Sequence, residues 1–305
     1  MKYRVEQMMV DPDWYDYISI IALSPVAFIY GVLMLVRRVL TPKKDFNIPI
    51  VSIGNLVVGG SGKTPFVIEL ASRYNKVAII SRGYGRQSRG LIEVSKEGNI
   101  CTTVEKSGDE AMLIAMSLPR ASVIVSEDRH KAIELAKENG AELIVLDDGF
   151  NRVEIEKFEV LLEPKKIKNY LPFPAGAFRE FWFSKKYADI VAKEGKEFKR
   201  VVAHEALKER MLLVTAIANP HRLDAYLPKG VEQKIYLEDH AYFKEEILEE
   251  MMKKCKAESL LVTEKDAVKM KGFKLPLSKM KLKLEIKDDI FVKIDHYIKG
   301  YHREK

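Results

Sequence analysis

The stretch VSIGNLVVGGSGKT, residues 51–64, decides the fold that this sequence predicts. An apolar run, residues 48–53, leads into it, and a segment compatible with a helix, residues 65–74, follows it. A strand, a glycine-rich turn and a helix in this order form a phosphate-binding P-loop. The N–H groups of the turn and the N-terminus of the helix face the phosphates, and a lysine reaches the outer ones. The stretch therefore predicts nucleotide binding, with a chance glycine turn as the alternative.

The loop departs from the strict pattern G-x-x-x-x-G-K-[ST] because Val57 occupies the position of the first glycine. The residues predicted to bind the phosphates of ATP are Gly59, Gly60, Ser61, Gly62, Lys63 and Thr64. Thr64 is also a predicted ligand of Mg²⁺. Val58 disfavours the variant motif of partitioning ATPases, which carries a signature lysine at that position.

The length of 305 residues predicts two domains, each with its own core. The net charge of +7 favours acidic partners such as phosphates, anionic lipids or nucleic acids. Basic residues stand in short groups between acidic ones, so no nucleic-acid partner is expected, and no obligate protein partner is indicated. Cys101 and Cys255 lack the spacing of metal ligands and are interpreted as reduced thiols.

Residues 18–36 carry no charge. A basic cluster follows them, consisting of Arg37, Arg38, Lys43 and Lys44. As a helix, the uncharged run covers roughly 28 Å, barely the hydrocarbon thickness of a membrane, with a kink at Pro25. A spanning helix, an interfacial helix and a buried helix remain open, whereas the basic residues after the run disfavour a signal peptide. In either membrane case, the basic cluster predicts that the rest of the chain is cytoplasmic.

Beyond the P-loop, short apolar segments alternate with amphipathic ones, which predicts an α/β fold with a parallel sheet. The expected strands are residues 76–81, 91–95, 100–104, 122–125 and 142–146, and the expected helices are residues 107–118 and 128–139. A second alternation predicts strands at 211–216, 234–237, 259–263 and 281–286, and helices at 220–226, 243–256, 265–270 and 288–298. Between the two, residues 169–186 predict a long surface segment and residues 200–210 predict a charged linker.

These patterns predict three parts. A membrane-associated hydrophobic helix comprises residues 1–45, a P-loop core domain with a parallel sheet comprises residues 46–205, and a smaller C-terminal α/β domain comprises residues 206–305. The two α/β domains are expected to face a cleft. In α/β folds, ligands bind at the carboxyl ends of the strands, so functional residues are expected there.

Two aspartates end an apolar strand of the predicted core domain. Asp147 and Asp148 occupy the place where a P-loop enzyme keeps a carboxylate for Mg²⁺. A plain Asp-Asp-Gly turn is the structural alternative, since this sequence is common in turns. Coupling to the P-loop favours the metal site.

Asp109 lies in the sequence Ser107-Gly108-Asp109-Glu110, just before an apolar helix. A capping box of Ser107 and Glu110 is the structural alternative to a catalytic carboxylate here. Residues 263–266 (TEKD) show a similar capping pattern. His240 follows two acids at a strand end; an adjacent acid can orient an imidazole for proton transfer, although a solvated loop histidine is the alternative.

Eight motifs occur in order along the chain: GNLVVGGSGKTP, SRGYGR, GDE, DDGF, LPFPAGAFRE, AIANP, EDH and TEKDAVK. Together they resemble the tetraacyldisaccharide 4′-kinases of lipid A biosynthesis over essentially the whole chain. The P-loop of that family lacks the first glycine, which accounts for Val57. The resemblance implies Mg²⁺-dependent transfer of the γ-phosphate of ATP to the 4′-hydroxyl of an acylated glucosamine disaccharide 1-phosphate. It also implies work at an anionic membrane surface, the cytoplasmic face of the inner membrane.

The same resemblance assigns roles to individual residues. It implies that Asp109 pairs with His240, one in each predicted domain, and that the pair activates the sugar hydroxyl. Arg179 corresponds to a basic residue near the reacting phosphates, with Glu180 beside it, and Lys63 is the phosphate-binding lysine. The implied metal ligands are Thr64, Asp147 and Asp148. The aromatic residues that follow form either an interfacial contact or a buried cluster: Phe178, Phe181, Trp182 and Phe183.

Two departures from the family pattern limit what is carried over. Asn151-Arg152 stands where the family has Gln-His, so no role is transferred from that histidine, and Arg152 is a candidate phosphate ligand instead. Leu237-Glu238 replaces the usual Phe-Pro before His240. A membrane-associated P-loop ATPase that acts on a protein partner is the alternative function, and a nucleic-acid-dependent ATPase has only the net charge in its favour. The ordered motifs favour the kinase.

Overall fold

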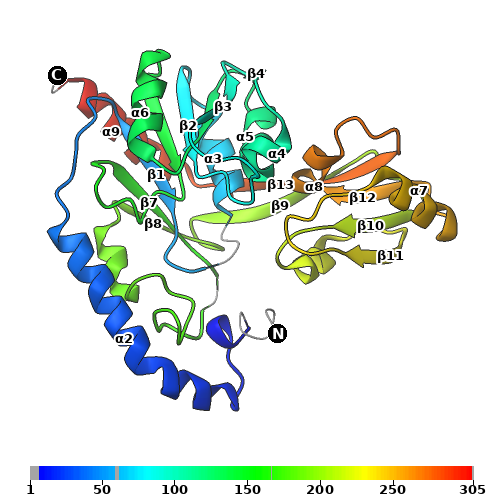
Figure 1. The fold of residues 1–305 in the computed structure, drawn as a ribbon, viewed down its shortest axis with the longest axis horizontal. Helices are drawn as coiled ribbons and strands as arrows, with labels where there is room; N and C mark the ends of the chain where they lie inside the picture. Colours follow the sequence, from blue (N-terminus) through cyan, green and yellow to red (C-terminus); the bar gives the residue numbers. More distant parts are fainter. Residues whose placement is uncertain (1–6, 59–61, 166, 304–305) are drawn as a thin grey trace. The chain divides into compact units, whose positions relative to one another are not determined.

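The structure, a computed structural model, describes residues 7–58, 62–165 and 167–303, which form two compact units (Figure 1). The first unit combines residues 1–70, 137–199 and 286–305, and the second combines residues 71–136 and 200–285. Each compact unit combines separate stretches of the sequence, whereas the predicted domains are continuous. The domain boundaries predicted after residues 45 and 205 therefore stay predictions.

The first unit contains four adjacent parallel strands in the order β6-β1-β7-β8. They are β1 (Ile50–Gly54), β6 (Leu143–Asp147), β7 (Phe158–Glu163) and β8 (Ile190–Lys193). Every residue of β1 and β6 is buried, as expected for parallel strands that are covered on both faces. The register places Ile53 beside Asp147, so the carboxyl end of β6 lies next to the start of the P-loop.

The second unit contains the strands β4-β3-β5-β2 in this order, with β2 and β5 parallel and β3 antiparallel to β4 and β5. They are β2 (Val77–Ser81), β3 (Ile92–Lys96), β4 (Asn99–Ile100) and β5 (Ser122–Val125). A five-stranded sheet follows the order β11-β10-β12-β13-β9. Its strands are β9 (Phe198–Glu205), β10 (Met211–Thr215), β11 (Val231–Tyr236), β12 (Ser259–Thr263) and β13 (Leu277–Ile286). The predicted α/β fold with a parallel-sheet core is confirmed.

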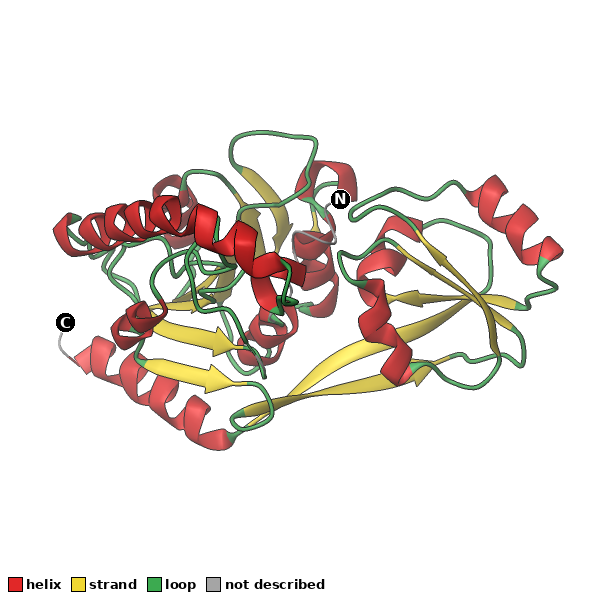
Figure 2. Ribbon diagram, turned by 90° about the horizontal axis from the view of Figure 1, so that it is seen from below, coloured by secondary structure: helices red, strands yellow, loops and turns green. Residues whose placement is uncertain are grey.

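Helices accompany these strands (Figure 2). From α2 onward they are α2 (Asp16–Leu40), α3 (Lys63–Ala71), α4 (Val104–Ser107), α5 (Asp109–Ser117), α6 (Arg129–Glu138), α7 (Glu245–Lys254), α8 (Glu264–Ala267) and α9 (Asp288–Arg303). Three 3₁₀ helices are η1 (Trp182–Tyr187), η2 (Pro220–Tyr226) and η3 (Val268–Met270). The C-terminal helix α9 packs on the first unit, because Tyr297 stacks on Phe158 of β7 at 5.0 Å and its hydroxyl accepts from the N–H of Ile50.

Three expectations between residues 98 and 210 are wrong. The predicted linker, residues 200–210, is largely occupied by β9, and the predicted strand 100–104 gives way to α4 at Val104. The predicted surface segment, residues 169–186, buries Ala175 and Phe178. The linker was predicted from the charged residues of this segment. These residues are compatible with β9, because β9 is the last strand in the sheet order and an edge strand tolerates charges that a central strand excludes.

The helix α2 lies along the first unit and is drawn in dark blue in Figure 1. Its buried residues Ile20, Ala27 and Gly31 follow one stripe of the helix. A Cβ at Gly31 would lie 2.7 Å from the ring of Phe181, so this close approach requires glycine. Among the described helices, α2 alone is long and apolar enough to cross a membrane, and most of its apolar side chains on the other faces are exposed.

Candidate active site

The P-loop begins where β1 ends and leads into α3. The amide of Asn55, which is buried, donates to the carbonyl of Val57, and its side-chain oxygen accepts from the ammonium of Lys63 at 3.0 Å. Gly62 has a φ of +85°, which favours glycine, and Lys63 is the first residue of α3. The other predicted phosphate ligands Gly59, Gly60 and Ser61 lie outside the described residues.

A carboxylate between two cations lies beside this loop. Lys63 Nζ is 3.5 Å from Asp148 Oδ1, and Arg179 Nη1 donates to both Asp148 oxygens at 2.9 and 3.0 Å. Asp148 follows β6 with a φ of +56°, and its N–H donates to the carbonyl of Ile53 at 2.9 Å. The fold thus brings together three residues that the sequence predicted from three separate motifs.

The cluster keeps a net positive charge, because two cations surround one carboxylate. Burial alone would raise the pKa of Asp148, but Lys63 and Arg179 outweigh it and hold that pKa below its usual value. Asp148 is therefore ionised at neutral pH, and one positive charge remains for an anionic ligand. Because a single nitrogen of Arg179 makes both bonds to Asp148, its guanidinium fork keeps further donors for a phosphate.

The oxygen donors near the P-loop fit a Mg²⁺ ion shared with a nucleotide. Thr64 is the second residue of α3, and Asp147 is the last residue of β6, followed at once by Asp148. Among the described residues, no cluster of three His, Cys, Asp or Glu side chains forms a metal cage. Mg²⁺ does not require one, since it is commonly bound by one or two carboxylates together with phosphates and water.

The second unit holds an aspartate–histidine pair. His240 Nδ1 lies 2.9 and 3.0 Å from the two carboxylate oxygens of Asp109. Asp109 is the first residue of α5 and is buried, whereas His240 lies in the loop between β11 and α7 with a φ of +63°. The ring of Tyr84 contacts the imidazole at 5.1 Å, and a Cβ at Gly85 would approach it to 3.2 Å. The SRGYGR motif thus helps to fix the histidine.

Two lysines of the TEKDAVK motif surround this pair. Lys269 Nζ is 3.6 Å from Asp109 and 3.4 Å from Asp266, and it donates to the carbonyl of Ala241 at 3.0 Å. Its side chain is only 1% exposed. Lys265 lies 3.8 Å from Asp109 and 3.0 Å from Glu110, closer to solvent. The motif, to which the sequence assigned only a helix cap, therefore supplies positive charge to the predicted catalytic carboxylate.

The charges around Asp109 fix the tautomer of His240. Burial alone would raise the pKa of Asp109, but the hydrogen bond from His240 and the nearby ammonium groups hold that pKa below its usual value. An ionised carboxylate only accepts hydrogen bonds, so Nδ1 of His240 carries the proton between them. In the neutral ring, Nε2 is then the nitrogen with a free lone pair, and it lies 3.5 Å from Asp239.

The capping alternative for the GDE motif is wrong in its proposed form. Ser107 is the last residue of α4, and its hydroxyl contacts the carbonyls of Thr103 and Gly108. Gly108, with a φ of +84°, is the N-cap of α5 and makes no side-chain cap. Asp109 is therefore the first acidic residue of α5 and also the partner of His240. The other capping pattern is confirmed, because Thr263 accepts from the N–H of Asp266.

Comparison with known proteins identifies the family of this chain. A family model described as LpxK, tetraacyldisaccharide-1-P 4′-kinase, matches residues 19–299. The chain belongs to this family. A tetraacyldisaccharide 4′-kinase of Helicobacter pylori is 48% identical over 97% of this chain and 95% of its own length, and one of Aliarcobacter butzleri is 44% identical over 97% of each. The crystal structure of LpxK from Aquifex aeolicus in complex with ATP has a TM-score of 0.76 and 27% identity, covering 92% of this chain and 99% of that one. The chain is accordingly an ATP-dependent kinase.

An ion pair that the sequence did not predict joins α2 to Glu180, the residue that follows Arg179. Arg38 donates to both oxygens of Glu180 at 2.7 Å, and a third bond reaches the carbonyl of Phe150. The Arg38 and Glu180 side chains are 7% and 4% exposed. Arg38 is therefore part of a buried ion pair within the protein, although the sequence grouped it with a basic cluster at a membrane surface. The sequence singled out Glu180 only as a neighbour of Arg179 in its motif. Nothing in that motif indicated Arg38 as the partner of Glu180.

The remaining predicted residues divide between core and surface. Phe178 is buried, whereas Trp182 is 47% exposed, so the aromatic group is neither wholly buried nor wholly interfacial. Arg152, the candidate phosphate ligand, lies 4.0 Å from Glu154. Leu237, three residues before His240, is 36% exposed.

Proposed function

We propose that this kinase transfers the γ-phosphate of ATP to the 4′-hydroxyl of an acylated glucosamine disaccharide 1-phosphate. The observation that carries the proposal is the pairing of Asp109 with His240 in a chain that also places two cations beside its P-loop. Phosphoryl transfer requires positioning, neutralisation of charge and, for an alcohol acceptor, a group that takes the hydroxyl proton.

The donor phosphates are assigned to the first unit. Lys63 and Arg179 bind the β- and γ-phosphates, because they flank Asp148 and leave one net positive charge in that cluster. Thr64, Asp147 and Asp148 would hold Mg²⁺, which would neutralise charge on the transferring phosphate. The remaining P-loop glycines supply backbone N–H groups to the same phosphates.

The acceptor hydroxyl is assigned to the second unit. The sugar oxygen attacks the γ-phosphorus, the bond from that phosphorus to the bridging oxygen of ADP breaks, and the hydroxyl proton passes to the Asp109–His240 pair. Both residues belong to one compact unit, so their pairing requires no movement between units. This differs from the expectation that the acid and its partner lie in separate domains.

Transfer of label decides between this function and an ATPase switch. The enzyme is incubated with γ-labelled ATP and detergent-dispersed acylated disaccharide 1-phosphate, and the lipid and the inorganic phosphate are separated. Label in the lipid, and its loss by orders of magnitude in Asp109→Ala with nucleotide binding retained, is the expected result. Label only in inorganic phosphate, at a rate independent of the lipid, would contradict the proposal.

We further propose that α2 lies in the membrane interface at the cytoplasmic face of the inner membrane. Its buried stripe and the Arg38–Glu180 pair hold it along the first unit, so lipid cannot surround it while these contacts persist. Its outer face presents exposed apolar side chains over several turns, among them Ile21, Ile29, Leu33 and Leu40. A helix with one docked face and one exposed apolar face suits the boundary of a bilayer.

Charges placed on the outer face test this location. Ile29 and Leu33 are 61% and 58% exposed, so Ile29→Glu/Leu33→Glu should release the enzyme from vesicles without lowering its melting temperature. The matched control is Ile247→Glu/Val292→Glu, which changes exposed apolar side chains on α7 and α9. Equal release by both variants would count against an interfacial role for α2.

A further inference from the structure

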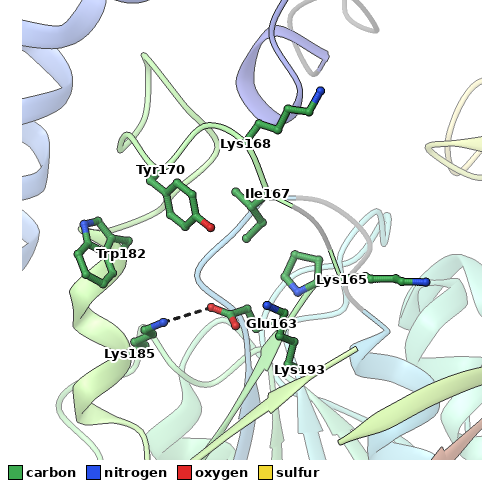
Figure 3. A pocket seen from close by; sticks show the side chains of 9 residues that line it. Glu163, Lys165, Ile167, Lys168, Tyr170, Trp182, Lys185 and Lys193 are labelled. Carbon is green, nitrogen blue, oxygen red and sulfur yellow. Dashed lines mark ion pairs between the residues drawn. The ribbon is translucent and has the colours of Figure 1, made fainter. Parts of the chain in front are cut away.

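A pocket of about 700 Å³ opens on the first unit, outside the residues assigned to catalysis (Figure 3). It lies where β7 ends, and η1 and the end of β8 complete its lining. None of Lys63, Asp148 and Arg179 lines it. The pocket is therefore distinct from the proposed nucleotide phosphate site.

The lining of this pocket is strongly basic. Four lysines line it against one carboxylate, that of Glu163: Lys165, Lys168, Lys185 and Lys193. Lys185 lies 3.5 Å from Glu163, an ion pair drawn as a dashed line in Figure 3, and Lys168 lies 2.7 Å from Asp11. Within the described part of the chain, Lys165 and Lys193 form no ion pair. Positive charge thus remains in the pocket after its internal pairs are counted.

Amphipathic aromatic side chains stand beside these lysines. Tyr170 and Trp182 line the pocket, are 51% and 47% exposed, and contact each other edge to face at 6.5 Å. Phe173, which is 47% exposed, contacts Tyr30 of α2 at 6.1 Å. The same stretch of chain therefore joins the basic pocket to the helix with the exposed apolar face.

We infer that this pocket binds the phosphate headgroup of an anionic bilayer phospholipid; the inference rests on the proposed interfacial location of α2. Cations beside exposed Tyr and Trp, followed by an exposed apolar helix face, reproduce the order of charge and polarity at the surface of an anionic bilayer. A site for free phosphate has no need of the aromatic rim, whereas a lipid headgroup arrives with acyl chains that the apolar surface covers. The phospholipid orients the kinase on the membrane and takes no part in phosphoryl transfer.

Binding to vesicles tests the inference. The full chain is titrated with vesicles of phosphatidylcholine, with and without phosphatidylglycerol, in the absence of ATP and acceptor lipid. Lys165→Ala/Lys193→Ala should bind phosphatidylglycerol vesicles about 25-fold more weakly, which corresponds to about 1 kcal/mol for each lysine at an anionic surface. The matched control is Lys208→Ala/Lys229→Ala, which removes the same charge from two exposed lysines of the second unit.

A fluorescence measurement locates the lipid. The chain has two tryptophans, so Trp14→Phe leaves Trp182 as the single reporter. A phospholipid with a spin label in its headgroup should quench Trp182, and the lysine substitutions should reduce this quenching, whereas inorganic phosphate should not compete.

Four outcomes overturn the inference. They are equal loss of binding in the control variant, equal affinity for neutral and anionic vesicles, competition by inorganic phosphate, and binding that requires the acceptor lipid. The kinase reaction on detergent-dispersed acceptor should be unchanged in the lysine variant. Failure of this inference is therefore distinguishable from failure of the proposed reaction, which the label-transfer assay decides.

Discussion

Replacing Lys269 by methionine removes a buried cation from between two buried carboxylates. Its ammonium lies 3.6 Å from Asp109 and 3.4 Å from Asp266, and it also holds the carbonyl of Ala241, next to His240. Methionine keeps the length of the side chain but supplies neither charge nor donor. Two effects follow: the carboxylates lose their compensation, and the loop that carries His240 loses an anchor.

The burial of Lys269 determines the size of the loss of stability, and its contact with the His240 loop determines the size of the loss of turnover. Leaving a buried charge without its partner costs about 3–5 kcal/mol, which lowers the melting temperature of a unit of roughly 150 residues by about 6–20 °C. Loss of the loop anchor displaces His240, and a displacement of about 1 Å in a catalytic group lowers turnover about 100-fold. The pKa of Asp109 should rise, since one of the charges that lowers it is gone.

The control is a lysine at almost the same distance from Asp109. Lys265 lies 3.8 Å from Asp109 and its side chain is 19% exposed, against 1% for Lys269. Water can therefore compensate its removal in part, so Lys265→Met should lower the melting temperature less than Lys269→Met does, although Lys265 too lowers the pKa of Asp109. Melting temperature and the pH dependence of phosphoryl transfer are measured for both variants. Equal effects of the two substitutions on stability, or full turnover in folded Lys269→Met, would refute the reasoning.

Three further predictions concern single interactions. Lys63 and Arg179 lower the pKa of Asp148, so the stability difference between wild type and Asp148→Asn should be constant from pH 8 to 5 and shrink only as the pH falls below the ordinary pKa of 3.8; a difference that closes between pH 7 and 5 would contradict this. Arg38→Met and Glu180→Gln should each cost about 3–5 kcal/mol in the free energy of unfolding, and together less than the sum, whereas additive costs would show that the pair is not coupled. Thr263→Ala should cost about 1 kcal/mol in denaturant unfolding and Thr263→Ser much less, and equal costs would exclude a capping role.

The parts of the fold that local patterns control could be predicted from the sequence. The buried strand β1, the glycine turn and α3 are adjacent in sequence, and their order alone indicates a P-loop. Strands β5 and β12 begin and end where their apolar runs predict. The edge strand β9 was missed because it carries charges and its partner comes from sequence far away, and the sequence did not predict β7 and β8 either.

Long-range pairs could not be predicted from spacing. Asp109 and His240 are 131 residues apart, and only the resemblance to a known family joined them. Lys269 lies in a motif whose sequence indicates a helix cap, and Arg38 lies in one that indicates a membrane-facing cluster, yet each compensates a buried carboxylate. Burial decides the role of such a side chain, and burial is a property of the whole fold.

The contact between Arg38 and Glu180 has a practical consequence for inhibitor discovery. Glu180 is joined by one peptide bond to Arg179, which holds Asp148, which in turn lies beside Lys63. Removing the apolar N-terminal helix to obtain a soluble form for screening would leave Glu180 buried without its cation. The contacts among Arg179, Asp148 and Lys63 would then weaken. Compounds selected on such a truncated enzyme would be optimised against a nucleotide site with altered electrostatics, so screens should keep residues 16–40 and supply detergent or lipid.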